Sequence, residues 1–88
     1  MTNCKIYITF VAINFTFMNL GNDLRRLRFE HGDISQEALA DQVGVTRQTI
    51  HSVEKGKFIP STLLALKIAR FFNVPFEKAF YIINNDHN

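Results

Sequence analysis

The sequence has few residues that build metal centres, and it has no long apolar run. It has a single cysteine, Cys4, which can form neither an intrachain disulfide nor a cysteine-based zinc cluster, and this favours a reducing, cytoplasmic setting. His31, His51 and His87 are dispersed without metal-ligand spacing. No apolar run reaches the about 18 residues that a membrane-spanning helix needs. We therefore expect no metal, no cofactor and no membrane partner.

The features of an active site are also scarce. There is no glycine-rich phosphate loop, and no nucleophile lies at a recognisable spacing from a base. The acidic residues Glu37, Asp41, Glu54 and Glu77 form no evident pair, and 88 residues leave little room for a closed cleft. We therefore predict that the protein is not an enzyme and has no small-molecule ligand.

The composition is that of one small globular domain. Apolar residues make up 47% of the chain and charged residues 20%, which excludes a disordered polar chain. A core of this size gives marginal stability, so dimerisation would help. The net charge of +2 permits nucleic-acid binding but does not argue for it, so the distribution of the basic residues must decide.

The central feature of the sequence is a pair of short helices around Gly44, within residues 36–55. Ser35 is a helix N-cap, so the first helix of the pair should begin near Gln36. The inward stripe of this helix consists of Leu39, Ala40 and Val43. At Gly44 the periodicity breaks, as expected where the chain turns sharply with a positive φ. The small Ala40 side chain lets the two helices cross closely.

The second helix, residues 46–54, has an apolar face and a polar face. Thr46 is its expected N-cap. At ~100° per residue, Thr46, Val53 and Glu54 lie within roughly 60° of Ile50, on the packed face. The outer half carries Gln48, His51, Ser52 and Lys55, with Arg47 and Thr49 near its flanks. A tight helix pair with a polar outer face is what the DNA major groove admits.

These residues resemble a known family. The pattern Gln36, Ala40, Gly44, Ile50 and Val53, followed by Glu-Lys-Gly-Lys at 54–57 and Pro-Ser at 60–61, is similar to the helix-turn-helix of lambda-repressor-like (Xre- and Cro-type) DNA-binding proteins. The resemblance covers residues 20–80. It implies an all-α, compact five-helix domain that binds double-stranded DNA as a homodimer and acts as a transcriptional regulator, with repression as the expected mode.

The remaining helices are predicted from their capping residues and from the spacing of their apolar residues. A first helix is expected from Asn22 or Asp23 to Glu30, ended by Gly32. Ser61 caps a helix whose inward stripe is Leu64, Ala65, Ile68, Ala69 and Phe72. Pro75 suits the start of a short fifth helix, with Phe76 and Phe80 pointing inward. Residues 81–83 are predicted to form a terminal strand beside the residues just ahead of the first helix.

Two further predictions concern packing. The family resemblance implies that Arg28 pairs with Glu54, whose inward angle would otherwise leave a carboxylate near the core without a partner. Leu63 and Leu66 fall off the inward stripe of their helix. They are either ordinary surface leucines or part of a subunit interface, and the small core favours the interface.

The first 17 residues lie outside the resemblance. Their content of Ile, Val, Phe, Tyr and Thr favours a strand over residues 5–17. A signal peptide is disfavoured because Thr9, Asn14 and Thr16 interrupt the apolar stretch. Alternatively, Met18 is the native start and the preceding residues come from an upstream start assignment. These alternatives stay open; the predicted domain is residues 18–88.

The outer face of the second helix supplies the predicted DNA contacts. The Gln48 amide can form paired hydrogen bonds with the edge of adenine, and the Arg47 guanidinium can do so with the edge of guanine. Ser52 can reach a base edge or a phosphate. Phosphate or charge contacts are predicted for Gln36, Thr46, Thr49, His51, Lys55 and Lys57. The ordinary alternative is a solvated helix face, and this face is nearly free of acidic residues. An alternative from another class is a protein-interaction module, such as an antitoxin-like one, that binds DNA weakly or not at all.

Overall fold

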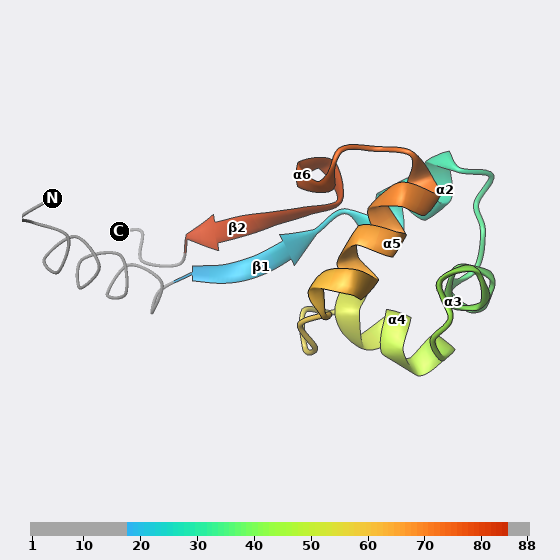
Figure 1. The fold of residues 1–88 in the computed structure, drawn as a ribbon, viewed down its shortest axis with the longest axis horizontal. Helices are drawn as coiled ribbons and strands as arrows, with labels where there is room; N and C mark the ends of the chain where they lie inside the picture. The colour runs from blue at the N-terminus through green and yellow to red at the C-terminus, as the bar shows by residue number, and fades with distance from the viewer. Residues whose placement is uncertain (1–17, 85–88) are drawn as a thin grey trace, which may run out of the picture.

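The computed structural model describes residues 18–84, so the expectations for residues 1–17 lie outside the described residues. The elements are β1 (Met18–Asn22), α2 (Leu24–Glu30), α3 (Gln36–Val43), α4 (Arg47–Glu54), α5 (Thr62–Phe72), α6 (Phe76–Ala79) and β2 (Phe80–Asn84). The five helices pack into one body, and the two strands form a ribbon beside it (Figure 1). This confirms the predicted fold class, a compact helical domain with short terminal strands.

The helix starts follow from local sequence. Three predicted N-cap hydroxyls accept the backbone N–H three residues later: Ser35 from Ala38 at 2.9 Å, Thr46 from Thr49 at 3.1 Å and Ser61 from Leu64 at 3.1 Å. Each such bond satisfies one of the donors that a helix N-terminus leaves without an intrahelical partner. The predictions for these three caps are confirmed.

The core lies where α2, α3, α4 and α5 meet. All five predicted inward residues of α5 are buried, and α5 crosses the middle of the helical body (Figure 1). The largest fully buried side chains are Leu24, Leu39, Ile50, Val53, Ile68 and Phe80. Burying an aliphatic or aromatic side chain of this size stabilises the fold by about 1.5–3 kcal/mol relative to exposure. Among them, Ile50 and Val53 bury the inner face of α4 in this core.

The first and last elements of the described chain, β1 and β2, pair with each other. β1 and β2 are antiparallel, with Asn22 opposite Phe80 and Gly21 opposite Tyr81. A Cβ atom on Gly21 would lie 2.4 Å from Tyr81 Cε1 and 2.7 Å from Ile83 Cδ1, so glycine lets these side chains cross β1 closely. The Tyr81 hydroxyl lies 3.2 Å from the Asn22 carbonyl oxygen and 3.2 Å from Asp23 Oδ1. The predicted terminal strand and its pairing are confirmed.

Two predictions of side-chain direction are wrong. Phe76 is 38% exposed and stacks on Phe80, with ring centroids 5.6 Å apart, while Phe80 takes the inner position. Helix α6 has only four residues, so helical spacing gives no reliable inward face. Thr46 is exposed because, as the N-cap, it has extended backbone angles (φ −86°, ψ 158°) to which a helical angle does not apply.

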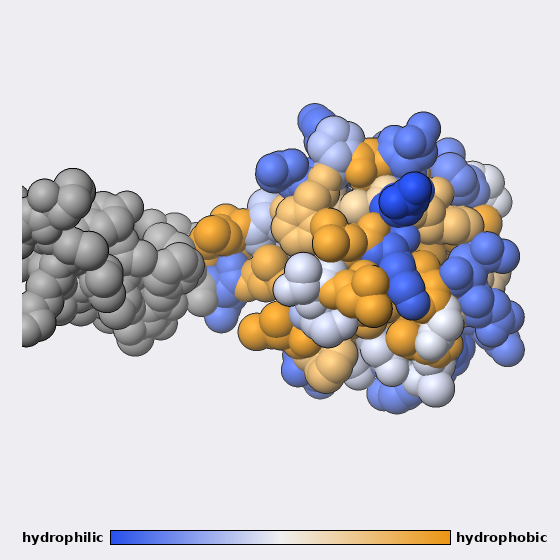
Figure 2. Space-filling view, viewed as in Figure 1, coloured by the Kyte–Doolittle hydropathy of each residue, from blue (hydrophilic) through white to orange (hydrophobic). Residues whose placement is uncertain are grey.

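The surface of α5 is more apolar than the core requires. Leu63 is 64% exposed and Leu66 49% exposed. Figure 2, in the same view as Figure 1, shows apolar side chains over α5 and along the ribbon. A shallow groove between α5 and α6 is lined by Leu63, Leu66, Lys67, Arg70, Pro75 and Phe76, among others. Within residues 18–84, no helix has the length and apolar character required to cross a membrane.

Candidate nucleic-acid interface

The turn between α3 and α4 sets how the outer face of α4 is presented. Gly44 has φ +79°, and the N–H groups of Gly44 and Val45 both donate to the Ala40 carbonyl, at 2.8 Å and 3.0 Å. This left-handed residue ends α3 and lets the chain turn sharply before α4. Ala40 is 1% exposed, and its small side chain lets α4 pack closely against α3. The turn was predicted from the sequence, and its geometry is as expected.

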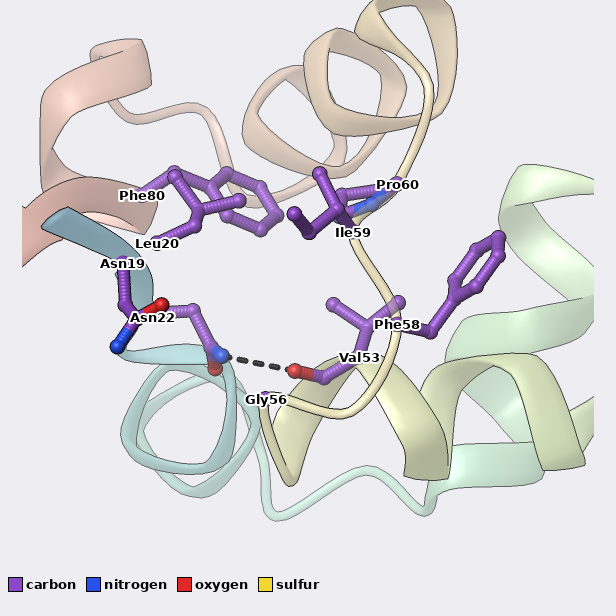
Figure 3. A pocket seen from close by; sticks show the side chains of 9 residues that line it. All are labelled: Asn19, Leu20, Asn22, Val53, Gly56, Phe58, Ile59, Pro60 and Phe80. Atoms are coloured by element: carbon purple, nitrogen blue, oxygen red, sulfur yellow. Dashed lines mark hydrogen bonds between the residues drawn. The ribbon is translucent and has the colours of Figure 1, made fainter. Parts of the chain in front are cut away.

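The inner side of α4 is fixed to the body. Ile50 and Val53 are 0% and 2% exposed. At the end of the helix, the Asn22 side-chain amide donates to the Val53 carbonyl at 2.9 Å (Figure 3). This bond closes one side of a small pocket formed with Leu20, Gly56, Phe58, Ile59, Pro60 and Phe80, among others (Figure 3). Sequence reasoning missed the bond, because Asn22 was considered only as a cap for α2.

The outer side of α4 is open to solvent. Arg47, Gln48 and Lys55 are exposed, and so is Lys57 just beyond the helix. The remaining candidates on α4, Thr49, His51 and Ser52, are half-buried. Of the three side chains predicted to reach bases, Arg47 and Gln48 are therefore open to solvent, and Ser52 is partly covered by residues 18–84.

The electrostatics of this face favour an anionic partner. Arg47, Lys55 and Lys57 form no ion pair within residues 18–84. Glu54, the acidic residue nearest to them in sequence, is turned inward, with its side chain 8% exposed. Three cations without a neutralising acid give a local positive potential, which attracts a phosphate backbone.

The predicted pair between Arg28 and Glu54 is present. Arg28 Nε donates to Glu54 Oε2 at 2.6 Å and Arg28 Nη2 to Glu54 Oε1 at 3.2 Å. The third contact of the guanidinium runs from Nη1 to the Ile34 carbonyl at 2.8 Å. This bidentate pair connects α2 to the C-terminal turn of α4, so it holds that end of α4 in place.

Gln36, for which a phosphate contact is predicted, has hydrogen bonds within the protein. Its Nε2 donates to Glu54 Oε1 at 3.0 Å and its Oε1 accepts from Arg47 Nη1 at 3.0 Å. The same Nε2 lies 3.5 Å from Nδ1 of the His51 ring. The side chain thus joins α3 to both ends of α4. No sequence spacing indicates this arrangement, because it depends on how closely the two helices cross.

The two threonines act at the start of α4. Besides capping the helix, Thr46 Oγ1 lies 3.0 Å from Thr49 Oγ1, within hydrogen-bond distance. Their hydroxyls therefore already have partners in the protein, and a phosphate contact from either remains a prediction. In the part of the chain that the structure describes, no group of three or more His, Cys, Asp or Glu side chains is arranged to hold a metal ion.

Comparison with known proteins agrees with this geometry. A helix-turn-helix family model, HTH_3, matches residues 24–78, from the first residue of α2 into α6. The chain belongs to the helix-turn-helix family of the Xre, lambda-repressor-like type. This family consists of DNA-binding transcriptional regulators rather than enzymes, as the sequence predicted.

Relatives of this helix-turn-helix protein come from bacteria and archaea. It is 48% identical to the HTH-type transcriptional regulator YgzD of Bacillus subtilis over 61 residues, which are 69% of this chain and 91% of the relative. It is 51% identical to the HTH-type transcriptional regulator MJ0272 of Methanocaldococcus jannaschii over 59 residues, covering 67% and 88%. The control protein C.MunI of a Mycoplasma species is 32% identical over 69 residues, covering 78% and 93%.

Proposed function

We propose that this protein is a sequence-specific regulator, a repressor, that reads the major groove of double-stranded DNA with the outer face of α4. One observation carries the proposal: Arg47 and Gln48 are exposed, and Ser52 is half-buried, on a helix whose opposite side is anchored by Ile50 and Val53. A rigid helix with an open polar face can enter the groove without losing its own packing.

The side chains suit base reading. The amide of Gln48 can pair with adenine N6 and N7, and the guanidinium fork of Arg47 with guanine N7 and O6, each worth about 1–3 kcal/mol of discrimination. Lys55 and Lys57 would contact phosphates at the far end of α4, and His51 would do so when protonated. These contacts position the helix on the duplex, while the base contacts specify the sequence.

The protein would act as a homodimer in the cytoplasm. The exposed Leu63 and Leu66 support the dimer, because a second copy would cover the apolar groove that they line. A two-fold dimer would place its two recognition helices about 34 Å apart, one turn of DNA, and would bind a two-fold-related operator.

Selection of bound duplexes from a random DNA pool tests the proposal. The expected result is a two-fold symmetric consensus with half-sites one helical turn apart. With about five phosphate contacts per subunit, the logarithm of the binding constant should fall with a slope near −0.9 per contact against the logarithm of salt concentration. Absent or salt-insensitive binding would instead favour a protein-interaction module, with the α5 groove as its docking face.

A further inference from the structure

The His51 side chain on α4 has one ring nitrogen facing α3. Its Nδ1 lies 3.5 Å from Nε2 of Gln36. The Gln36 amide has one orientation here, because its Oε1 accepts from Arg47 and its Nε2 donates to Glu54, both at 3.0 Å. An amide nitrogen only donates, so Nδ1 of His51 is the acceptor, and a neutral ring in this place carries its proton on Nε2.

The charged neighbours of this ring are mostly cations. Arg47 and Lys55 lie one helical turn before and after His51 on α4, and neither forms an ion pair within residues 18–84. The charge of Glu54 is compensated by Arg28, whose Nε lies 2.6 Å from Glu54 Oε2. In the free protein, a proton added to Nδ1 would therefore meet an N–H group of α3 and two cations of α4.

The acidic residues of α3 do not change this environment. Neither Glu37 nor Asp41 is ion-paired with the His51 ring in the described part of the chain. Bound DNA would change it, because a helix in the major groove has phosphates on both sides. Phosphates neutralise nearby cations, and they stabilise an imidazolium that donates to them. Histidine is the side chain that ordinarily changes charge between pH 5 and 8, so a new anion beside it alters its charge under physiological conditions.

We propose that operator binding takes up one proton from solvent at His51, so that the affinity for DNA rises as the pH falls from about 8 to about 6. This proposal rests on the proposed function, in which the outer face of α4 enters the major groove. Protonation gives up the hydrogen bond from Gln36 Nε2 and makes both ring nitrogens donors. If the proton affinity of the ring rises about tenfold on binding, the binding constant should rise roughly 3- to 10-fold per subunit over this pH range.

Operator binding measured between about pH 6 and pH 8, at one ionic strength, tests the proposal. The variant His51→Gln keeps an acceptor for Gln36 Nε2 but takes up no proton, so its binding constant should be nearly independent of pH. His31→Gln is the matched control and should keep the full pH dependence, since the His31 ring lies 5.4 Å from the rings of Phe71 and Phe72 on α5. Equal pH dependence in the wild type and His51→Gln, or an affinity that falls on acidification, overturns the proposal.

Isothermal titration calorimetry counts the protons directly. Titrations in two buffers of different ionisation enthalpy should show that the wild type takes up about half a proton more per subunit than His51→Gln near pH 7. The comparison of the two proteins removes the contribution of the α-amino group, which titrates in the same range. Equal proton uptake in the two proteins contradicts the assignment to His51.

Nuclear magnetic resonance of the ring nitrogens separates this proposal from the proposed function. Near pH 7.5 the free protein should carry a proton on Nε2 of His51 and none on Nδ1, and a proton on Nδ1 would overturn the arrangement from which the proposal starts. Near pH 6.5 the operator complex should have both nitrogens protonated. A wild type that binds its operator with a neutral His51 overturns this proposal alone. A wild type that binds no duplex at any of these pH values overturns the proposed function, and the proposal with it.

Discussion

The side-chain amide of Asn22, which lies just ahead of α2, donates to the backbone carbonyl of Val53 in the last turn of α4, at 2.9 Å. The same side chain accepts the Leu24 N–H through its Oδ1 at 3.1 Å. One residue therefore serves the start of α2 and the end of the recognition helix. Asn22 and Val53 are 31 residues apart in sequence.

Asn22→Ala should lower the free energy of unfolding by about 1–2 kcal/mol, because it removes two hydrogen bonds and leaves a carbonyl without its partner. Chemical denaturation monitored by circular dichroism measures this. Asn19→Ala is the matched control, since Asn19 is exposed on β1 and should be nearly neutral. Equal effects of the two substitutions would show that the bond to Val53 contributes nothing.

Arg28→Met should destabilise the domain by about 3 kcal/mol, because the Glu54 carboxylate, 8% exposed, would lose its charged partner. The double variant Arg28→Met/Glu54→Leu should be less destabilised than the sum of its single variants. Denaturation of all four proteins gives the coupling energy. A coupling near zero would mean that the pair behaves like an exposed ion pair.

The helices were predictable because their signals are local. The caps Ser35, Thr46 and Ser61 and the stripes of α3 and α5 lie within a few residues of the structures they specify. The outer face of α4 followed from the same periodicity once the turn at Gly44 was placed. The pairing of Arg28 with Glu54 needed the family resemblance, because no spacing connects two residues on different helices.

The contacts that the sequence did not indicate join elements that are distant in sequence and depend on how those elements pack. The bonds from Gln36 to Arg47 and Glu54 exist only because α3 and α4 cross closely, and the bond from Asn22 to Val53 only because α2 begins beside the end of α4. The predicted inward orientation of Phe76 was wrong because a four-residue helix is too short for its apolar spacing to define a buried face. These details concern how the site is supported, whereas its exposed face was found from the pattern.

Tyr81 provides a test at high pH. Partial burial raises the pKa of its phenol above the ordinary 10.0, and the nearby Asp23 carboxylate raises this pKa further. Because the folded state binds the phenol proton more tightly, its stabilising contribution is present below pH 10 and is lost as the pH rises through the folded pKa. Ultraviolet titration of the wild type minus Tyr81→Phe should show this delayed ionisation. Asp23→Asn should bring the pKa down; an unchanged value would contradict the role of Asp23.

Leu63→Ser and Leu66→Ser should shift the protein from dimer to monomer, because each removes apolar area from the proposed interface. Sedimentation equilibrium measures the change in the dimer dissociation constant, expected to be at least about tenfold for the double variant. Phe29→Ser is the control, since Phe29 is 70% exposed on α2, away from the groove. A wild type that is monomeric at high concentration would rule out the interface.

The most direct measurement compares base preference in wild-type protein and Gln48→Ala across all single-base variants of the selected operator. If α4 reads bases with its outer face, Gln48→Ala should lose about 1–3 kcal/mol of preference at one base pair per half-site and keep its preference elsewhere, with an unchanged fold. Preference that is identical in the two proteins at every position would contradict direct reading by Gln48 and remove the main support for the proposed orientation of α4 in the groove.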